Sequence, residues 1–203
     1  MAQAADEQSG ASSSAVSPAR ARILEAAERV VADVGAARLT LDVVAQAAGV
    51  SKGGLLYHFP SKESLLSALA QRYVDSMEHC VDAAKNDLAI ETPSRYLKAC
   101  VVGILGRDPR SKAMGAALFA TAANDLTLLE VIRECIAKCT NELAQDEELN
   151  FARAAVVSLA VDGLMMRESL RISAYSDEQR ELIVKELMQL ADEAHVGAGS
   201  KNE

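Results

Sequence analysis

The chain has 203 residues, half of them hydrophobic, and a net charge of -8. This length is enough for one large or two small domains. The hydrophobic content is that of a folded globular protein with a buried core. No apolar run reaches the roughly eighteen residues of a membrane span, and the N-terminus lacks a basic segment followed by an apolar one, so we expect a cytoplasmic protein. Without a secretion signal, the four cysteines are expected to be reduced thiols.

The N-terminal part of the chain predicts a tail and one helix. Residues 1–17 are rich in Ala, Ser and Gln and show no periodicity, so we expect a disordered tail there. A helix is predicted from Pro18, a favourable first residue, to Val34, because apolar residues recur at helical spacing. Gly35 then ends the pattern.

Two shorter helices are predicted next. The first begins near Thr40, a suitable N-cap, and ends at Gly49, which can supply the left-handed residue that closes a helix. The second covers residues 52–59, with Ser51 as its N-cap, and stops before Pro60, because the residue before a proline disfavours helical conformation. The segment therefore reads as a helix, a tight turn and a helix.

This arrangement is typical of the helix-turn-helix, whose second helix reads the DNA major groove. The stretch also resembles the N-terminal signature of the tetracycline-repressor (TetR) family of one-component transcriptional regulators, in a match from about Arg22 to Tyr73. The resemblance implies a helical, dimeric regulator that binds DNA and a small effector. The residues that carry it are Thr40, Val44, Ala45, Ala48, Gly49, Val50, Ser51, Gly53, Leu55, His58, Phe59, Lys62 and Glu63.

Several side chains of this stretch suit contacts with DNA. Hydroxyls at helix N-termini favour a phosphate, with helix capping alone as the alternative. The long polar side chain at the start of the reading helix suits a guanine edge or a phosphate, with an exposed lysine of no role as the alternative. By resemblance, His58 and Lys62 contact phosphates. The candidates are Thr40, Ser51, Lys52, Gly53, Gly54, Tyr57, His58 and Lys62.

The two glycines of the reading helix need a separate explanation. Gly53 and Gly54 each cost about 1 kcal/mol relative to Ala in a helix, which is tolerated where the backbone must approach a partner closely. The chain departs from the family at Gly54, where a small hydroxyl residue is common, and at Leu56, where Tyr is usual. Both departures remove side-chain contacts, so we expect base reading to rest on few direct bonds and partly on DNA shape.

The acidic charge is unevenly distributed. Residues 18–75 carry seven basic and six acidic side chains, whereas residues 76–203 carry fourteen basic and twenty-one acidic ones. The acidic load therefore lies outside the segment expected to bind DNA, where it would repel DNA from the wrong faces. Because the segment itself is only weakly basic, affinity must come from well-placed contacts and from dimerisation.

The rest of the chain is helical in pattern throughout. The fold class is therefore all-α with about nine helices, comprising a helix-turn-helix DNA-binding domain over 18–60, a larger ligand-binding and dimerisation domain over 61–195, and a flexible tail over 196–203. The further helices are predicted over 61–88, 93–105, from 109 onward, 126–144, 147–172 and 177–195.

The sequence gives little support for a metal site, a redox site or a catalytic centre. Cys135 and Cys139 lie one helical turn apart and could hold a metal or form a redox site, but zinc-type spacings are absent and buried thiols are common in helical cores. We expect no metal, cofactor or catalytic residue. Single acids such as Asp162 and Glu168 are expected to be surface or interface groups.

The last two predicted helices each carry an apolar face. Since a regulator that binds DNA as a pair needs a dimer interface, these faces suggest a four-helix interface. The alternative is that they close the core of the monomer. The residues are Ala154, Ala155, Ser158, Leu159, Asp162, Gly163 and Met166 on one helix and Ile183, Leu187, Leu190 and Ala194 on the other.

The resemblance also implies an effector cavity enclosed by the fifth to eighth predicted helices. Methionine walls adapt to ligands of different shape. The low aromatic content argues against a cage for a quaternary ammonium. The candidate wall residues are Cys100, Ile104, Met114, Leu118, Met165 and Met166.

We therefore expect a homodimeric repressor that binds a palindromic double-stranded operator and releases it when a small apolar or amphipathic molecule binds. One alternative is a helical enzyme or thiol sensor with an incidental helix-turn-helix. Another is a regulator of the same kind that activates transcription or needs its ligand in order to bind DNA.

Overall fold

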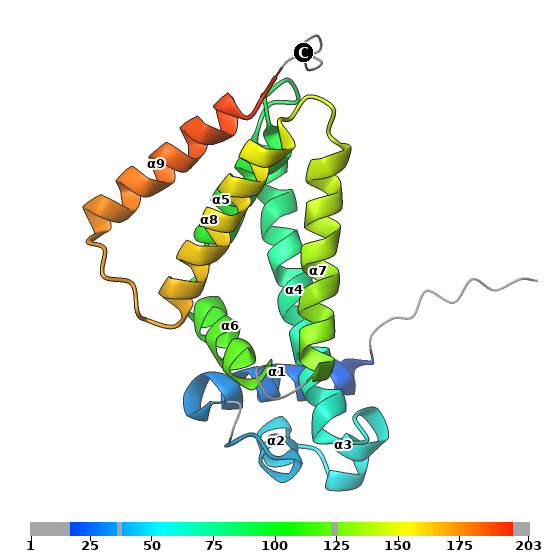
Figure 1. Cartoon of the computed structure of the whole chain (residues 1–203). Helices are drawn as coiled ribbons and strands as arrows, with labels where there is room; N and C mark the ends of the chain where they lie inside the picture. The colour runs from blue at the N-terminus through cyan, green and yellow to red at the C-terminus, as the bar shows by residue number, and fades with distance from the viewer. Residues whose placement is uncertain (1–16, 36–37, 123–125, 197–203) are drawn as a thin grey trace, which may run out of the picture.

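The computed structural model describes residues 17–35, 38–122 and 126–196 (Figure 1). Within these ranges the chain forms nine helices and no strand apart from one isolated bridge, so the all-helical prediction is confirmed. The predicted tails over 1–16 and 197–203 lie outside the described residues. The helices are α1 (Pro18–Val34), α2 (Leu41–Ala48), α3 (Lys52–His58), α4 (Lys62–Asp87), α5 (Arg95–Leu105), α6 (Pro109–Ala122), α7 (Leu126–Gln145), α8 (Phe151–Ser169) and α9 (Asp177–Glu193).

The helix ends in the first part of the chain follow the capping residues. The Thr40 hydroxyl accepts a hydrogen bond from the Val43 amide at 3.3 Å, and Ser51 accepts one from Gly54 at 3.0 Å. Gly49 closes α2 in the left-handed conformation, with φ 64°. These three features confirm the predicted helix, turn and helix, because each satisfies backbone groups that a helix end leaves unpaired.

Three predicted helices in the second part have boundaries that are wrong by a few residues. Helix α5 begins at Arg95 and not at Pro93, because Ser94 adopts a left-handed φ of 51° before it. Helix α8 spans 151–169 and not 147–172, since Asn150 caps its start and Arg171 turns left-handed after its end, with φ 56°. Helix α9 stops at Glu193, and the chain after it pairs with the segment before α8, where Asn150 donates its amide to the Ala194 carbonyl at 2.8 Å.

The helices are arranged around the long helix α4 (Figure 1). Helices α1 to α3 gather at its N-terminal end, and the C-terminal end of α9 lies at the far end of the molecule. The buried side chains form two clusters. A lower cluster joins α1 to α3 with the start of α4 and parts of α6 and α7, and an upper cluster joins the end of α4 with α5, α7, α8 and α9.

Helices α4 and α5 touch through their backbones. A Cβ atom added to Gly103 of α5 would lie 2.7 Å from the carbonyl oxygen of Cys80 on α4, which is closer than packed atoms approach. The crossing therefore requires a glycine. It fixes the upper half of α4 against α5.

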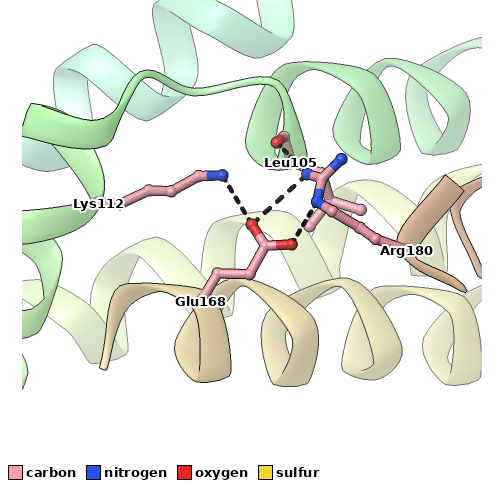
Figure 2. Close-up of polar contacts among 4 residues, drawn as sticks. All are labelled: Leu105, Lys112, Glu168 and Arg180. Atoms are coloured by element: carbon pink, nitrogen blue, oxygen red, sulfur yellow. Dashed lines mark hydrogen bonds and ion pairs between the residues drawn. The ribbon is translucent and has the colours of Figure 1, made fainter. Parts of the chain in front are cut away.

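A polar clasp holds four helices together beside the lower end of α8 (Figure 2). Glu168 accepts hydrogen bonds from Lys112 at 2.7 Å and from Arg180 at 2.6 Å, and Arg180 also donates to the Leu105 carbonyl at 2.7 Å. Burial alone would raise the pKa of Glu168, but the bonds from Arg180 and Lys112 hold it below its usual value. Glu168 is therefore a structural group that connects α6, α8 and α9, with α5 joined through Arg180.

Candidate functional site

The short helix α3 is held by apolar contacts on its inner side. Leu55 is fully buried and Phe59, directly after the helix, is almost so. Arg22 of α1 donates a hydrogen bond to the Ala48 carbonyl at 2.9 Å, and Arg20 lies 5.1 Å above the Phe59 ring. These arginines were not singled out in the sequence, because their partners are more than twenty-five residues away.

The outer side of α3 and the helix starts next to it carry the predicted DNA contacts. Tyr57 is 83 % exposed, and its ring meets that of His58 edge to face, with 5.0 Å between the centroids. Thr40 and Ser51 are exposed N-caps, as described above. A hydroxyl that accepts an amide proton still has its own O–H to donate, so capping and a phosphate contact are compatible.

Lys52 has a partner that the sequence did not predict. Its ammonium lies 2.9 Å from a carboxylate oxygen of Asp42 on α2, and both side chains are well exposed. An exposed pair of this kind contributes little to stability, about 0–1 kcal/mol, so it can be exchanged for another partner at small cost. In the free protein, Asp42 holds Lys52 beside the start of α3.

The remaining candidates for DNA contact, Gly53, Gly54 and Lys62, differ in the free space around them. A Cβ atom at Gly53 would meet nothing within 4 Å, whereas one at Gly54 would lie 3.2 Å from the Ser51 hydroxyl. Packing inside the chain therefore gives no reason for glycine at position 53. Lys62 is the first residue of α4 and is half-buried beside its N-cap, Ser61.

A cavity of about 400 Å³ lies between α4, α5, α6, α7 and α8. Its wall is mainly apolar, which suits the body of a small organic molecule. Of the six predicted wall residues, five line it and Met114 does not; Met114 is buried in the lower cluster. The five are Cys100, Ile104, Leu118, Met165 and Met166.

Aromatic residues also line the cavity, contrary to the expectation from the low aromatic content of the chain. Tyr73, Tyr96, Phe119 and Phe151 all line it, although the whole chain has only four tyrosines and three phenylalanines. The low aromatic content of the whole chain therefore does not describe this wall, which holds four of the seven Tyr and Phe residues. The four residues come from α4, α5, α6 and α8, so only the packing of the helices brings them to one wall.

Three thiols face the same cavity. Cys100 of α5 and Cys135 and Cys139 of α7 all belong to its wall. Hydrogen bonding with Cys135 lowers the pKa of Cys139 to about 6, and the same contact raises the pKa of Cys135. Burial raises the pKa of Cys100 to about 12. Within the described ranges, no three His, Cys, Asp or Glu side chains are grouped so as to hold a metal ion.

The apolar faces of α8 and α9 divide between core and surface. Leu187 and Ala194, which the sequence suggested for a dimer interface, are buried in the upper cluster together with Ala154, so for these residues the alternative of a monomer core is correct. Other apolar side chains on the two helices, or directly after α8, are exposed. They are Val156 (61 %), Leu159 (69 %), Met166 (43 %), Leu170 (39 %) and Leu182 (66 %).

No helix in the described part of the chain is long and apolar enough to cross a membrane.

Two family models match the chain. Residues 23–69 match the model for bacterial regulatory proteins of the tetR family, and residues 94–192 match the tetracyclin repressor-like C-terminal domain. The first match contains α2 and α3, and the second contains most of the cavity wall.

Curated proteins give the same relationship. The chain is 30 % identical over 165 residues to the HTH-type transcriptional regulator TtgR of Pseudomonas putida, covering 73 % of this chain and 79 % of that protein. It is 38 % identical over 89 residues to the HTH-type transcriptional regulator RutR of Escherichia coli, covering 44 % of this chain and 42 % of that protein.

Solved structures share the fold. A transcriptional regulator from Rhodococcus sp. Rha1 superposes with a TM-score of 0.70 at 24 % identity, covering 90 % of this chain and 98 % of that one. The multidrug binding protein EbrR complexed with ethidium superposes with a TM-score of 0.63 at 25 % identity, covering 83 % and 98 %. From the helix-turn-helix, the two matching family models and the similarity to TtgR, we conclude that the chain belongs to the TetR family of transcriptional regulators.

Proposed function

We propose that the chain is a repressor that binds a palindromic operator as a homodimer and releases it when a small apolar or amphipathic molecule enters the cavity. The proposal rests on three buried residues that belong both to the cavity wall and to the core of the DNA-binding end. Ala70, Leu118 and Leu128 line the cavity and also belong to the lower cluster that holds α1, α2 and α3. A ligand that moves these side chains must therefore disturb the packing beneath the reading helix.

The dimer part of the proposal rests on the exposed apolar residues of α8 and α9. Val156 and Leu159 on α8, Leu170 directly after it and Leu182 on α9 are all more than a third exposed. A second copy that packs on these helices would bury them and would set the spacing of the two reading helices. The charge change Val156→Glu, at a residue outside the cavity wall, should therefore give monomers in sedimentation and weaken operator binding.

The proposal is tested by sequencing the genomic DNA that the purified protein captures, with and without lipophilic compounds. We expect an enriched palindrome, and we expect compounds that raise the melting temperature to release it, since ligand binding stabilises the folded state. Capture without sequence preference would refute the operator. Compounds that stabilise the protein and leave operator affinity unchanged would refute the coupling.

A thiol sensor is a second candidate, favoured by the three thiols on the cavity wall. A thiolate is the reactive form of cysteine, and Cys139 has a lowered pKa. If the thiols sense electrophiles, iodoacetamide at neutral pH should label Cys139 well before Cys100 and should release operator DNA. If labelling leaves DNA binding unchanged, the thiols belong only to the wall.

A further inference from the structure

Among its described residues, the cavity wall contains one Asp or Glu side chain and no basic one. Asp162 of α8 lies there, between wall residues that are apolar, aromatic, hydroxyl or thiol in character. No lysine, arginine or histidine belongs to the described wall, and Arg107 and Lys85 lie against the rings of the wall residues Tyr73 and Tyr96. Asp162 is therefore the one carboxylate among the described wall residues, and its charge adds a negative potential to the cavity.

Asp162 has no partner within the described chain. None of the hydrogen bonds or ion pairs of the described residues includes it, and its partial burial raises its pKa. Glu168 on the same helix differs, because Lys112 and Arg180 both bind its carboxylate. A carboxylate that loses water without gaining a partner destabilises the protein unless something else supplies the positive charge.

We propose that Asp162 recognises the positive charge of an amphipathic cation, a lipophilic amine or ammonium compound, whose apolar body fills the cavity. This inference rests on the proposed function, since it names the class of effector that the same cavity takes. The cation would return to Asp162 the electrostatic stabilisation that burial removed. Phe119 and Phe151 belong to the same wall, and an aromatic ring there can attract a cation. The volume of about 400 Å³ suits a molecule of drug size.

The same arrangement selects against other ligands. An anionic amphiphile would bring a second negative charge into a space that has no basic side chain among the described residues. A neutral molecule could fill the apolar space but would leave Asp162 without a partner. The cavity should therefore prefer a cation to a neutral molecule of similar shape.

Ethidium and dihydroethidium form a suitable pair of probes, because the second is the neutral reduced form with the same ring system. Their affinities for the full-length protein can be compared by fluorescence titration without DNA and without air. We expect ethidium to bind at least about tenfold more tightly, as a charge-assisted contact in a desolvated site allows. In Asp162→Asn that preference should disappear, with dihydroethidium affinity unchanged.

Asp82→Asn is the matched control, because Asp82 is an exposed acid of α4 outside the cavity wall. It removes the same charge and should leave both affinities unaltered. If Asp162→Asn did not fold, the wild-type preference for ethidium over dihydroethidium would still decide the question.

The outcomes separate this inference from the proposed function. If both probes bind equally and Asp162→Asn changes neither, the cavity takes ligands but the charge recognition is wrong. If Asp162→Asn instead breaks the dimer, the carboxylate pairs with the second copy and the inference is also wrong. If neither ethidium nor dihydroethidium binds, the inference falls, and the proposed function then depends on the operator-release experiment with other compounds.

Discussion

The DNA-binding end and the cavity end of the molecule are packed in opposite ways. Around α3 the lower cluster is filled, and Ile23, Val44, Leu55 and Leu65 are all 0 % exposed. Between α4 and α8 the helices instead leave about 400 Å³ unfilled. A filled core has one arrangement and holds the reading helix in fixed geometry, whereas a hollow one can accept ligands of different shape. The two tasks of the protein therefore need different densities of packing.

The largest expected effect compares two buried leucines. Leu55→Ala, in the filled cluster, should lower the free energy of unfolding by about 3 kcal/mol and abolish operator binding, because it leaves a new void beneath α3. Leu143→Ala, in a residue that lines the cavity and is 4 % exposed, should cost less than half as much, since one side of Leu143 already lacks neighbours. Urea denaturation of both variants measures the difference. Equal losses would show that the two ends do not differ in this way.

Removing the charge of Glu168 tests how much the polar clasp stabilises the helices around the cavity. Glu168→Gln should cost about 2 kcal/mol at neutral pH, because two charged donors lose a charged acceptor. The pKa of Glu168 is lowered from 4.5, so its contribution is complete above that pH and is lost as the pH falls through the lower folded value. The difference between wild type and Glu168→Gln should therefore shrink in acid.

Glu181→Gln on the exposed side of α9 serves as the control and should change stability little at any pH. Parallel stability curves for wild type and Glu168→Gln between pH 7 and pH 3 would contradict the role given to the clasp.

Gly53→Ala separates stability from DNA binding in the filled half. Since a Cβ atom there meets nothing within 4 Å, the substitution should stabilise α3 by up to about 1 kcal/mol. If the backbone approaches DNA closely at this position, operator affinity should fall about tenfold, the equivalent of 1.4 kcal/mol. Thermal unfolding and operator titration on the same sample measure both. Unchanged affinity would mean that Gly53 does not approach DNA.

The smallest expected effect concerns a single phosphate contact. Lys62→Ala should weaken operator and non-operator DNA alike and reduce the salt slope of binding by about 1. Lys185→Ala, an exposed lysine on α9, should leave the slope unchanged. An unaltered slope for Lys62→Ala would place the DNA elsewhere on this end of the molecule.

Local features of the fold could be predicted because their causes are local. Thr40, Gly49 and Ser51 each act within a few residues, and the structure has them as N-cap, left-handed C-cap and N-cap. Ser94 and Arg171 could not be predicted in the same way, since neither is a glycine yet both have positive φ. Ser94 is buried, whereas Arg171 is exposed and closes α8 through hydrogen bonds from the Arg171 and Ile172 amides to the Glu168 and Arg167 carbonyls. A residue other than glycine gives no sign of either conformation in the sequence.

Contacts between distant helices are the features that the sequence predicted least well. Apolar spacing correctly grouped Leu187 with Ala194, but it could not tell a face that packs on the same chain from one that stays exposed. For the same reason Met114 was placed in the cavity wall, and the pairing of Lys52 with Asp42 was missed. Each of these depends on which helix faces which, and that follows from the whole fold.

The backbone contact between Gly103 and Cys80 makes α4 a lever with a fulcrum. Above that point α5 holds the helix, and below it the helix passes the cavity and ends at Lys62 in the DNA-binding end. From Cys80 to Lys62 the helical rise gives an arm of about 27 Å. Each degree of rotation about the fulcrum therefore moves the tip by about 0.5 Å. A few degrees produced by a ligand at Tyr73 or Met77, which line the cavity along this arm, would shift the reading helix by more than an ångström.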